Sequence, residues 1–168
     1  MSDERVPLYF AYGSNLNPRQ MAERCPGHRV VGRASLADYR LLFRGYGRDW
    51  AGAVGTVEPT PGSIVWGAVF ELAPAHYATL DEYEGYDGPG AATSLYDRVE
   101  VTVDLEGRGA VPCLTYVMRQ DPEGLPSRAY LDAIVAGLRH HALPEAYIAA
   151  LAAHPTADPR AKGADQWP

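Results

Sequence analysis

A strand that stops abruptly at a glycine constrains the N-terminal part of this chain more than any other feature. The apolar and aromatic residues 8–12 predict a buried strand. Residues 13–15, Gly-Ser-Asn, interrupt it, and Asn17 and Pro18 then form the pair expected at a helix N-cap and first helical position. A strand, a tight turn and a helix point successive backbone N–H groups at one spot, where a carboxylate or an oxyanion can bind. An ordinary strand-to-helix turn has the same sequence, and this segment alone favours that simpler interpretation.

The composition is that of a single globular domain. The chain has 168 residues, of which 46% are apolar and 21% charged, enough to bury a core. A net charge of −6 and a pI near 5.3 argue against a nucleic-acid partner, because nucleic acids favour basic faces. No apolar run reaches the length of a membrane span, and residues 1–5 do not resemble a signal peptide. We therefore expect a cytoplasmic protein without membrane contact, with one domain over residues 1–154 and a tail over 155–168.

The cysteine and histidine residues give no sign of a metal site. Cys25 and Cys113 lie far apart and lack CxxC or Cys/His spacing, so we expect two buried free thiols rather than a disulfide. His140 and His141 end a predicted helix, where imidazoles commonly bond the terminal carbonyl groups. No metal and no cofactor is expected.

Strand signals dominate the first two thirds of the chain, and helical signals follow. We predict strands over residues 8–12, 29–34, 39–43, 52–57, 64–72, 96–105 and 111–118. We predict helices over residues 17–24, 74–84, 128–141 and 144–153. Pro-Thr-Pro-Gly at 59–62 predicts a turn between two of these strands. The regular alternation that a doubly wound parallel sheet needs is missing, so the pattern predicts an α+β domain with a small, curved, mixed, barrel-like sheet and flanking helices.

The predicted helix at 74–84 carries one carboxylate on its apolar face. Tyr77, Leu80 and Glu84 share that face at spacings i, i+3 and i+7, whereas Asp81 and Glu82 point away from it. Burial and the negative end of the helix dipole both raise the pKa of such a carboxyl group, which suits a residue that takes up a proton. A solvated acidic helix end, with its boundary displaced by a residue or two, explains the same pattern equally well.

Two segments together resemble the gamma-glutamylcyclotransferase family, also called the AIG2-like or BtrG-like group. Residues 9–16 are similar almost residue for residue to the N-terminal signature of that family. Residues 80–85, Leu-Asp-Glu-Tyr-Glu-Gly, resemble the segment that ends in its catalytic glutamate, and weaker similarity extends over roughly residues 8–150. The resemblance implies a strongly curved, barrel-like sheet with flanking helices. It also implies intramolecular aminolysis of a γ-glutamyl amide, which releases 5-oxoproline and a free amino acid or amine.

The resemblance also implies which residues act. Glu84 is the expected general base and acid, because the α-amino group of the substrate must lose a proton before it attacks its own γ-carbonyl. The residues expected to bind substrate are those of the N-terminal signature and two tyrosines: Tyr9, Phe10, Ala11, Tyr12, Gly13, Ser14, Asn15, Leu16, Tyr116 and Tyr130. The backbone amides of residues 13–16 would hold either the α-carboxylate or the tetrahedral oxyanion. Both tyrosines near the C-terminus also suit a plain packing role.

Three interpretations of function remain open at this point. The first is cyclisation of γ-glutamyl amino acids or amines, and the second is another acyl transfer or amide cleavage on such compounds. The third is a binding module of this fold that has lost activity, against which the retention of Glu84 argues. The expected partner is a small γ-glutamyl compound, and the sequence leaves a homodimer open. The Gly-rich segments 45–50 and 86–94 are expected to form an open rim around the leaving group.

Overall fold

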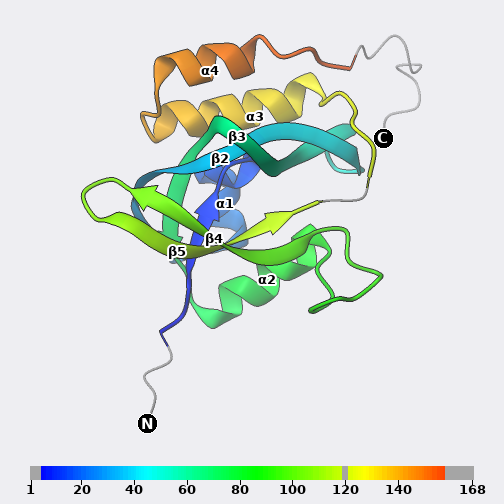
Figure 1. The fold of residues 1–168 in the computed structure, drawn as a ribbon. Coiled ribbons are helices and arrows are strands. Elements are labelled where there is room, and N and C mark those ends of the chain that lie inside the picture. Colours follow the sequence, from blue (N-terminus) through cyan, green and yellow to red (C-terminus); the bar gives the residue numbers. More distant parts are fainter. Residues whose placement is uncertain (1–4, 119–120, 158–168) are drawn as a thin grey trace.

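Five strands close into a barrel in the computed structural model, which describes residues 5–118 and 121–157 (Figure 1). The strands are β1 (Leu8–Ala11), β2 (Arg29–Gly47), β3 (Gly52–Glu71), β4 (Asp97–Leu105) and β5 (Gly109–Val117). Their order around the barrel is β1-β3-β2-β4-β5; β1 and β5 pair in parallel and every other pair is antiparallel. The α+β class and the mixed, barrel-like sheet predicted from the sequence are confirmed.

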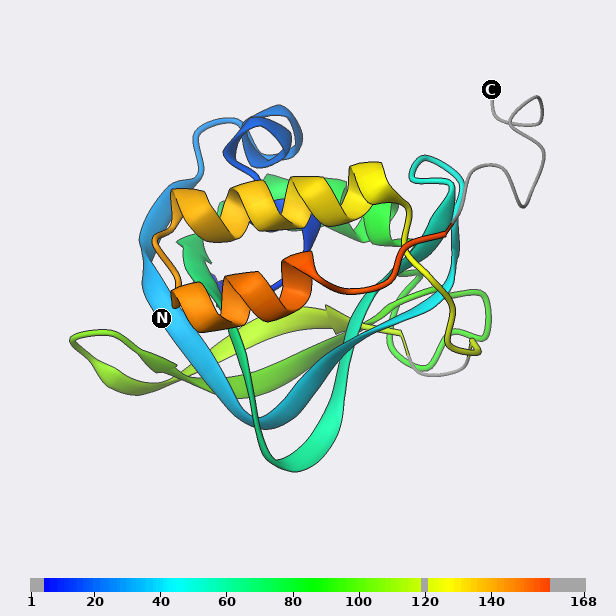
Figure 2. The same cartoon turned by 90° about the horizontal axis from the view of Figure 1, so that it is seen from above.

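Within the described residues, four α-helices and one short 3₁₀ helix flank the barrel. They are η1 (Ser14–Leu16), α1 (Pro18–Arg24), α2 (Pro74–Glu84), α3 (Arg128–His140) and α4 (Glu145–Ala152). The helices α3 and α4 lie side by side on one side of the barrel, and α2 lies on the opposite side (Figures 1 and 2). No helix in the described part of the chain is both long and apolar enough to cross a membrane.

Local chemistry sets the helix ends as predicted. The side chain of Asn17 accepts hydrogen bonds from two amides of the first turn of α1, at 3.1 and 3.4 Å, and Pro18 occupies the first helical position. Helix α2 ends at Gly85, whose φ of 66° is a left-handed conformation that glycine adopts without strain. Ser127 caps α3 through a hydrogen bond from the Tyr130 amide. These caps fix where α1 begins, where α2 ends and where α3 begins. Glu84 at the end of α2 and Tyr130 in the first turn of α3 line the candidate site.

The prediction of four separate strands over residues 29–72 is wrong, because they form two long strands. Strand β2 is continuous across the predicted gap at 35–38, and β3 is continuous across the Pro-Thr-Pro-Gly segment. The pairing steps from Ala37 opposite Ile64 to Tyr39 opposite Pro59, so residues 60–63 form a bulge rather than a turn. The carboxylate of Asp38 accepts a hydrogen bond of 2.9 Å from the Gly62 amide and so joins the two strands at the bulge.

The core has two parts, one inside the barrel and one between the barrel and the helices. Inside lie mostly valine and leucine side chains with Phe10. The second cluster joins η1, α1, α2, α3 and α4, and it includes Leu16, Leu80 and Leu138, all fully buried. Helix α3 approaches η1 closely at Gly137, where a Cβ atom would lie 2.5 Å from the carbonyl carbon of Leu16. The packing of α3 therefore holds the Gly-Ser-Asn segment in place.

Two other predictions concern the cysteines of the core and the chain end. Cys25 and Cys113 are free and buried, as predicted. Most of the predicted tail at 155–168 lies outside the described residues. Within its described part, the Ala157 amide donates a hydrogen bond of 2.9 Å to the carbonyl oxygen of Pro126.

Candidate active site

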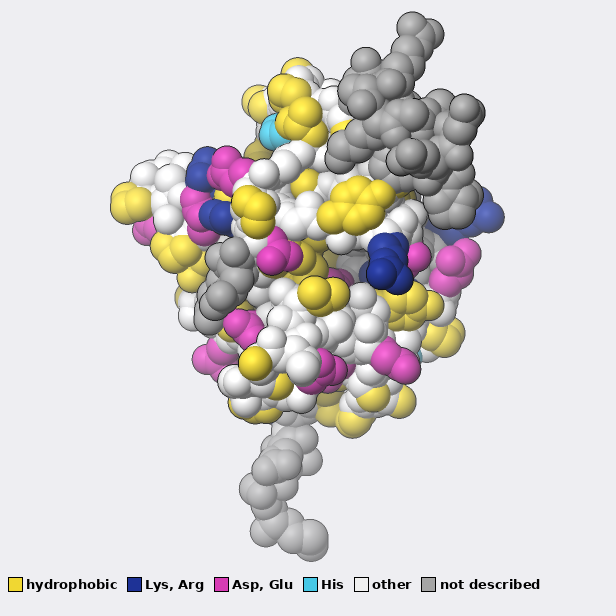
Figure 3. Space-filling view, turned by 90° about the vertical axis from the view of Figure 1, so that its right-hand side faces the viewer, with side chains coloured by type: hydrophobic (Ala, Val, Ile, Leu, Met, Phe, Trp, Pro, Cys, Tyr) yellow, Lys and Arg dark blue, Asp and Glu magenta, His cyan; other side chains and the backbone are white. Residues whose placement is uncertain are grey.

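A cavity of about 610 Å³ opens where β1, η1, the end of α2, the start of α3 and the tip of the β2–β3 hairpin meet. On the face that carries its mouth, hydrophobic, basic and acidic side chains border a hollow (Figure 3). Eight of the predicted site residues line this cavity: Tyr9, Tyr12, Gly13, Ser14, Asn15, Glu84, Tyr116 and Tyr130. Segments that are far apart in the sequence thus meet at one place.

Three predicted substrate-binding residues do not line the cavity. Phe10 alternates with its neighbours along β1 and is packed inside the barrel with no exposed surface. Ala11 is buried in the cluster beneath the helices. Leu16 is fully buried under α3, next to Gly137. The structure therefore does not bring Phe10, Ala11 and Leu16 to the cavity, because side chains within one sequence motif point to different sides of the structure.

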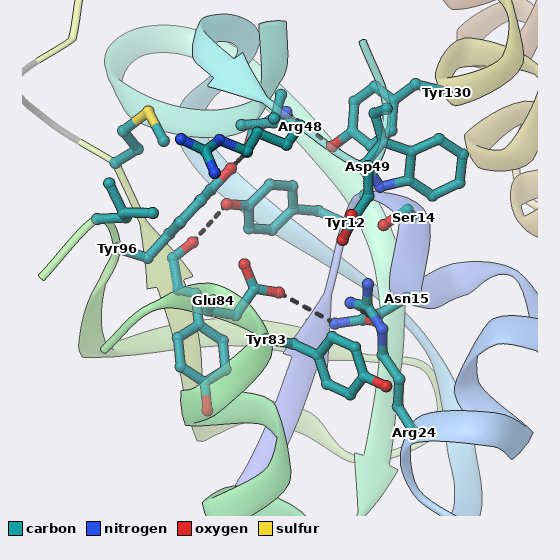
Figure 4. A pocket seen from close by; sticks show the side chains of 18 of the residues that line it. Tyr12, Ser14, Asn15, Arg24, Arg48, Asp49, Tyr83, Glu84, Tyr96 and Tyr130 are labelled. Carbon is teal, nitrogen blue, oxygen red and sulfur yellow. Dashed lines mark hydrogen bonds between the residues drawn. The ribbon is translucent and has the colours of Figure 1, made fainter. Parts of the chain in front are cut away.

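Glu84 is the last residue of α2 and its carboxylate faces the cavity (Figure 4). Burial raises its pKa from 4.5 to about 7, while the charge of Arg24 and a hydrogen bond from Asn15 act in the opposite direction. That hydrogen bond joins Asn15 Nδ2 to Glu84 Oε1 at 3.4 Å. A carboxyl group with a pKa near neutrality can both accept and return a proton at physiological pH.

The structure contradicts the prediction that the Asp81 side chain points to solvent. Its carboxylate accepts a hydrogen bond of 2.6 Å from the Tyr116 hydroxyl and pairs with Arg98 at 2.8 Å. The Asp81 side chain keeps only 23% of its surface exposed. The flank of α2 is covered by β4 and β5, which the periodicity of the helix alone does not reveal. Glu82 is exposed, as predicted.

Residues 14–16 form the 3₁₀ helix η1, with Gly13 as its N-cap, rather than a simple turn. The amides of Leu16 and Asn17 bond the carbonyl oxygens of Gly13 and Ser14, at 3.0 and 2.9 Å. The Leu16 amide is therefore not available to a ligand, contrary to the prediction for residues 13–16. The amides of Ser14 and Asn15 come first in η1 and have no intrahelical acceptor.

The hydroxyl groups of the cavity differ in whether they can donate a hydrogen bond to a ligand or only accept one. Tyr12 donates its proton to the carbonyl oxygen of Tyr116, and Tyr96 donates to the carbonyl oxygen of Gly55 at 2.7 Å. A carbonyl oxygen can only accept, so these two hydroxyl groups offer only lone pairs to a ligand. The Tyr116 hydroxyl is in the same state, because its proton is donated to a carboxylate.

Two other hydroxyl groups can donate a hydrogen bond to a ligand. Tyr130 accepts a hydrogen bond of 2.7 Å from the Gly55 amide, and Ser14 Oγ accepts one of 2.8 Å from Gln20 Nε2. Both therefore keep a proton that they can donate. They lie on the same side of the cavity, since a Cβ on Gly13 would be 3.6 Å from the Tyr130 oxygen. The cavity thus has an acceptor side, which includes Glu84, and a donor side around residues 13–15.

Some residues that line the cavity, such as Tyr96 and Arg24, were not predicted, whereas Trp50 was. Tyr96 was seen only as the start of a strand, and no spacing or motif in the sequence distinguishes it. Arg24 ends α1 and stacks on Tyr83, with its guanidinium carbon 4.2 Å from the ring centre. Trp50 packs against Tyr130 at 5.0 Å between ring centres. Trp50 falls in segment 45–50, whose residues 46–50 border the cavity as expected of a rim.

The other predicted rim segment and the histidines lie elsewhere. Residues 86–94 do not border the cavity; Leu95, directly after them, does. His141 Nε2 lies 3.1 Å from the carbonyl oxygen of Leu16 and so has a structural contact. Among residues 5–118 and 121–157, no group of three or more His, Cys, Asp or Glu side chains is arranged to hold a metal ion.

Comparisons with known proteins agree with this geometry. Residues 64–151 match the model of the AIG2-like family. The chain is 32% identical to the human gamma-glutamylcyclotransferase over 149 residues, which cover 86% of this chain and 77% of the human protein. The mouse gamma-glutamylcyclotransferase is 31% identical over 144 residues, 83% of this chain and 74% of its own length. A solved structure of a gamma-glutamyl cyclotransferase superposes with a TM-score of 0.84 at 30% identity, covering 90% of this chain and 89% of the other.

Proposed function

This chain belongs to the AIG2-like family and is similar to gamma-glutamylcyclotransferases, and we propose that it cyclises γ-glutamyl amides with Glu84 as general base and acid. The observation that carries the proposal is the placement of the Glu84 carboxyl group, whose pKa burial raises to about 7, in a cavity also lined by the Gly-Ser-Asn segment. The substrate is a small γ-glutamyl compound. Its products are 5-oxoproline and a free amino acid or amine.

The first step needs a base beside the α-nitrogen of the substrate. The Glu84 carboxylate takes one proton from the α-ammonium group, and the freed amine attacks the γ-carbonyl carbon to form a five-membered ring. The lone pairs of Tyr12 and Tyr96 on the acceptor side suit the N–H groups of that nitrogen. Because the attack is intramolecular, holding the glutamyl chain folded back on itself supplies much of the acceleration.

The second step needs stabilisation of a developing negative charge. When the C–N ring bond forms, the carbonyl oxygen becomes an oxyanion, which the Tyr130 and Ser14 hydroxyl groups and the amides of Ser14 and Asn15 can bind. The intermediate collapses as the original amide C–N bond breaks. In total two protons leave the α-nitrogen and two reach the leaving nitrogen, so Glu84 returns to its starting state.

The leaving group would lie at the mouth of the cavity. Tyr83 and Leu95 are 56% and 63% exposed there, beside Trp50 and the charged side chains of Arg48 and Asp49. This open rim is less restrictive than the enclosed end near Glu84. We therefore expect a stringent requirement for the γ-glutamyl part and graded rates among leaving groups.

A panel of amides tests the proposal. The protein is incubated with γ-glutamyl dipeptides and γ-glutamyl amines that differ in the leaving group, with the α-glutamyl isomer of each as a matched control. Chromatography with mass detection should find 5-oxoproline and the free amine in equal amounts from the γ-linked compounds and none from the α-linked ones. Equal turnover of both linkages, or hydrolysis to glutamate, would contradict the proposed reaction. Absence of turnover with every compound would favour the inactive binding module.

A further inference from the structure

The side-chain amide of Asn15 has every hydrogen-bonding position filled. Its nitrogen donates to the Tyr9 hydroxyl at 2.9 Å and to Glu84 Oε1 at 3.4 Å. Its oxygen accepts from Gln20 Nε2 at 2.9 Å and from Arg24 Nη1 at 3.0 Å. Asn15 is 4% exposed, so water does not compete for these positions. An amide has two N–H donors and two lone pairs, and all four are used here.

This pattern fixes which end of the amide faces Glu84. Gln20 and Arg24 each donate a hydrogen bond to the side-chain oxygen of Asn15. A guanidinium group contains no atom that can accept a hydrogen bond. If the amide were turned over, its N–H groups would face those donors and its oxygen would face the Glu84 carboxylate. Both contacts would then be repulsive, so the orientation that donates to Glu84 is strongly preferred.

Helix α1 brings these two donors to the same place. Gln20 and Arg24 are four residues apart, which puts them on one face of the helix, toward η1. Arg24 is half-buried between α1 and α2, where its guanidinium group also stacks on the Tyr83 ring at 4.2 Å. Figure 4 shows Asn15 between the Glu84 carboxylate and the Arg24 side chain.

Arg24 is also the cation whose charge acts on Glu84. The charged and titratable groups that share the cavity with Glu84 come from every element around it: Tyr9 and Tyr12 from β1 and its end, Arg24 from α1, Tyr46, Arg48 and Asp49 from the hairpin tip, Tyr83 from α2, Tyr96 before β4, Tyr116 from β5 and Tyr130 from α3. Arg48 and Asp49 are exposed at the mouth, where water and salt screen their charges, whereas Arg24 is half-buried.

We propose that Arg24 and Gln20 are positioning residues, which lock the Asn15 amide so that it donates to Glu84 and holds that carboxylate for proton transfer. The role of Glu84 in this statement rests on the proposed function. Neither Arg24 nor Gln20 needs to touch the reacting atoms. Arg24 contributes in two ways, through its hydrogen bond to Asn15 and through its positive charge.

The test compares Arg24→Met, which removes the donor and the charge but keeps a long apolar stem, with Arg24→Lys, which keeps the charge. Loss of the charge should move the acid limb of the kcat/KM pH profile upward by about one unit, a roughly tenfold loss of rate below the midpoint. Arg24→Lys should keep the wild-type midpoint but lose part of the plateau rate, because a single ammonium group replaces the planar guanidinium. Arg19→Met is the control, because Arg19 lies on the outer face of α1 with 90% of its side chain exposed.

A carbon-detected NMR titration of the Glu84 carboxyl group gives a readout that needs no substrate. It should show the same upward shift in Arg24→Met and none in Arg19→Met. An unmoved titration in folded Arg24→Met would overturn the proposal, whatever its activity. If the wild type cyclises no γ-glutamyl compound, the proposed function fails while this titration still decides the role of Arg24. Should Arg24→Met not fold, Gln20→Met serves instead. It frees the amide that donates to Glu84 but keeps the Arg24 charge, so a small upward shift of the Glu84 titration supports the proposal and an unmoved titration refutes it.

Discussion

Replacement of Glu84 by glutamine should make the protein more stable above neutral pH while it destroys activity. The wild-type carboxyl group is enclosed in the cavity, and burial raises its pKa from 4.5 to about 7. At 1.36 kcal/mol per pKa unit, the ionised group opposes folding by up to about 3 kcal/mol. A neutral amide avoids this penalty, and its oxygen can still accept the hydrogen bond from Asn15.

The size of the stability difference depends on pH. Below about pH 4.5 the carboxyl group is protonated in both the folded and the unfolded state, so the wild type and Glu84→Gln should differ little. Protonated Glu84 contributes to the unfolding free energy of the wild type, and this contribution is lost as the pH rises through about 7. Glutamine at this position does not ionise, so the variant has no such loss. Above that pH the difference should reach about 3 kcal/mol, or roughly 6–12 °C in Tm for a chain of this size.

Urea unfolding followed by far-UV circular dichroism at pH 4.5, 6 and 8 measures the difference directly. Glu82→Gln is the matched control, because Glu82 is exposed on the outer face of α2, and its stability difference should not vary with pH in this way. A Glu84→Gln variant that is less stable than the wild type at pH 8, or equally shifted at every pH, would refute the argument from burial.

The same pair of variants tests the chemistry. Glu84→Gln cannot accept the ammonium proton, so turnover should fall by roughly two to four orders of magnitude. Glu82→Gln should remain nearly as active as the wild type. If Glu82→Gln lost activity and Glu84→Gln kept it, the base would be misassigned; if neither variant lost activity, the cyclotransferase mechanism through this helix would be wrong.

Three further predictions concern the rate profile, a tyrosine and the thiols. Because Glu84 must be ionised to act as base, kcat/KM should rise about tenfold per pH unit below pH 7 and level off above it; a flat profile between pH 5 and 8 would exclude Glu84. Tyr130→Phe should lower kcat by about 10²–10³-fold, as expected for loss of an oxyanion donor, and lower the unfolding free energy by about 1–2 kcal/mol, since the buried Gly55 amide loses its partner; steady-state kinetics and urea unfolding measure both, and an unchanged kcat would remove Tyr130 from the donor side. The double variant Cys25→Ala/Cys113→Ala should cost about 1 kcal/mol of stability per site but keep its turnover, because both thiols are buried in the core and outside the cavity; loss of turnover in the folded variant would contradict this.

The long β2–β3 hairpin contradicts the strand boundaries predicted from the sequence. Pro-Thr-Pro-Gly at 59–62 is typical of a turn, and locally it does bend the chain. It remains within one strand because Asp38, on the neighbouring strand, bonds the Gly62 amide and the pairing resumes on either side. Whether turn residues end a strand or form a bulge depends on the partner strand, and a single segment does not contain that information.

The candidate site, like the fold, was predicted from the sequence only in part. The resemblance and the helix spacing predicted that Glu84 faces inward, and the structure places it in the cavity with Ser14, Asn15 and Tyr130. Helix periodicity could not show that Asp81 also has partners, because Arg98 and Tyr116 reach it from strands 17 and 35 residues further along the chain. The polarity of the hydroxyl groups was equally beyond the sequence, since it depends on which backbone group each one meets.

The sequence by itself determined the features that depend on near neighbours in the chain. These are the Asn17 and Ser127 caps, the left-handed end of α2 at Gly85, the apolar strand before residue 13 and the inward face of α2. Tertiary structure alone decided that the barrel closes through β1 and β5, and that Arg24 and Gln20 orient the Asn15 amide toward Glu84. The physical reason is range: capping and periodicity act over three or four residues, whereas burial, hydrogen-bond polarity and pKa depend on groups that only the folded chain brings together.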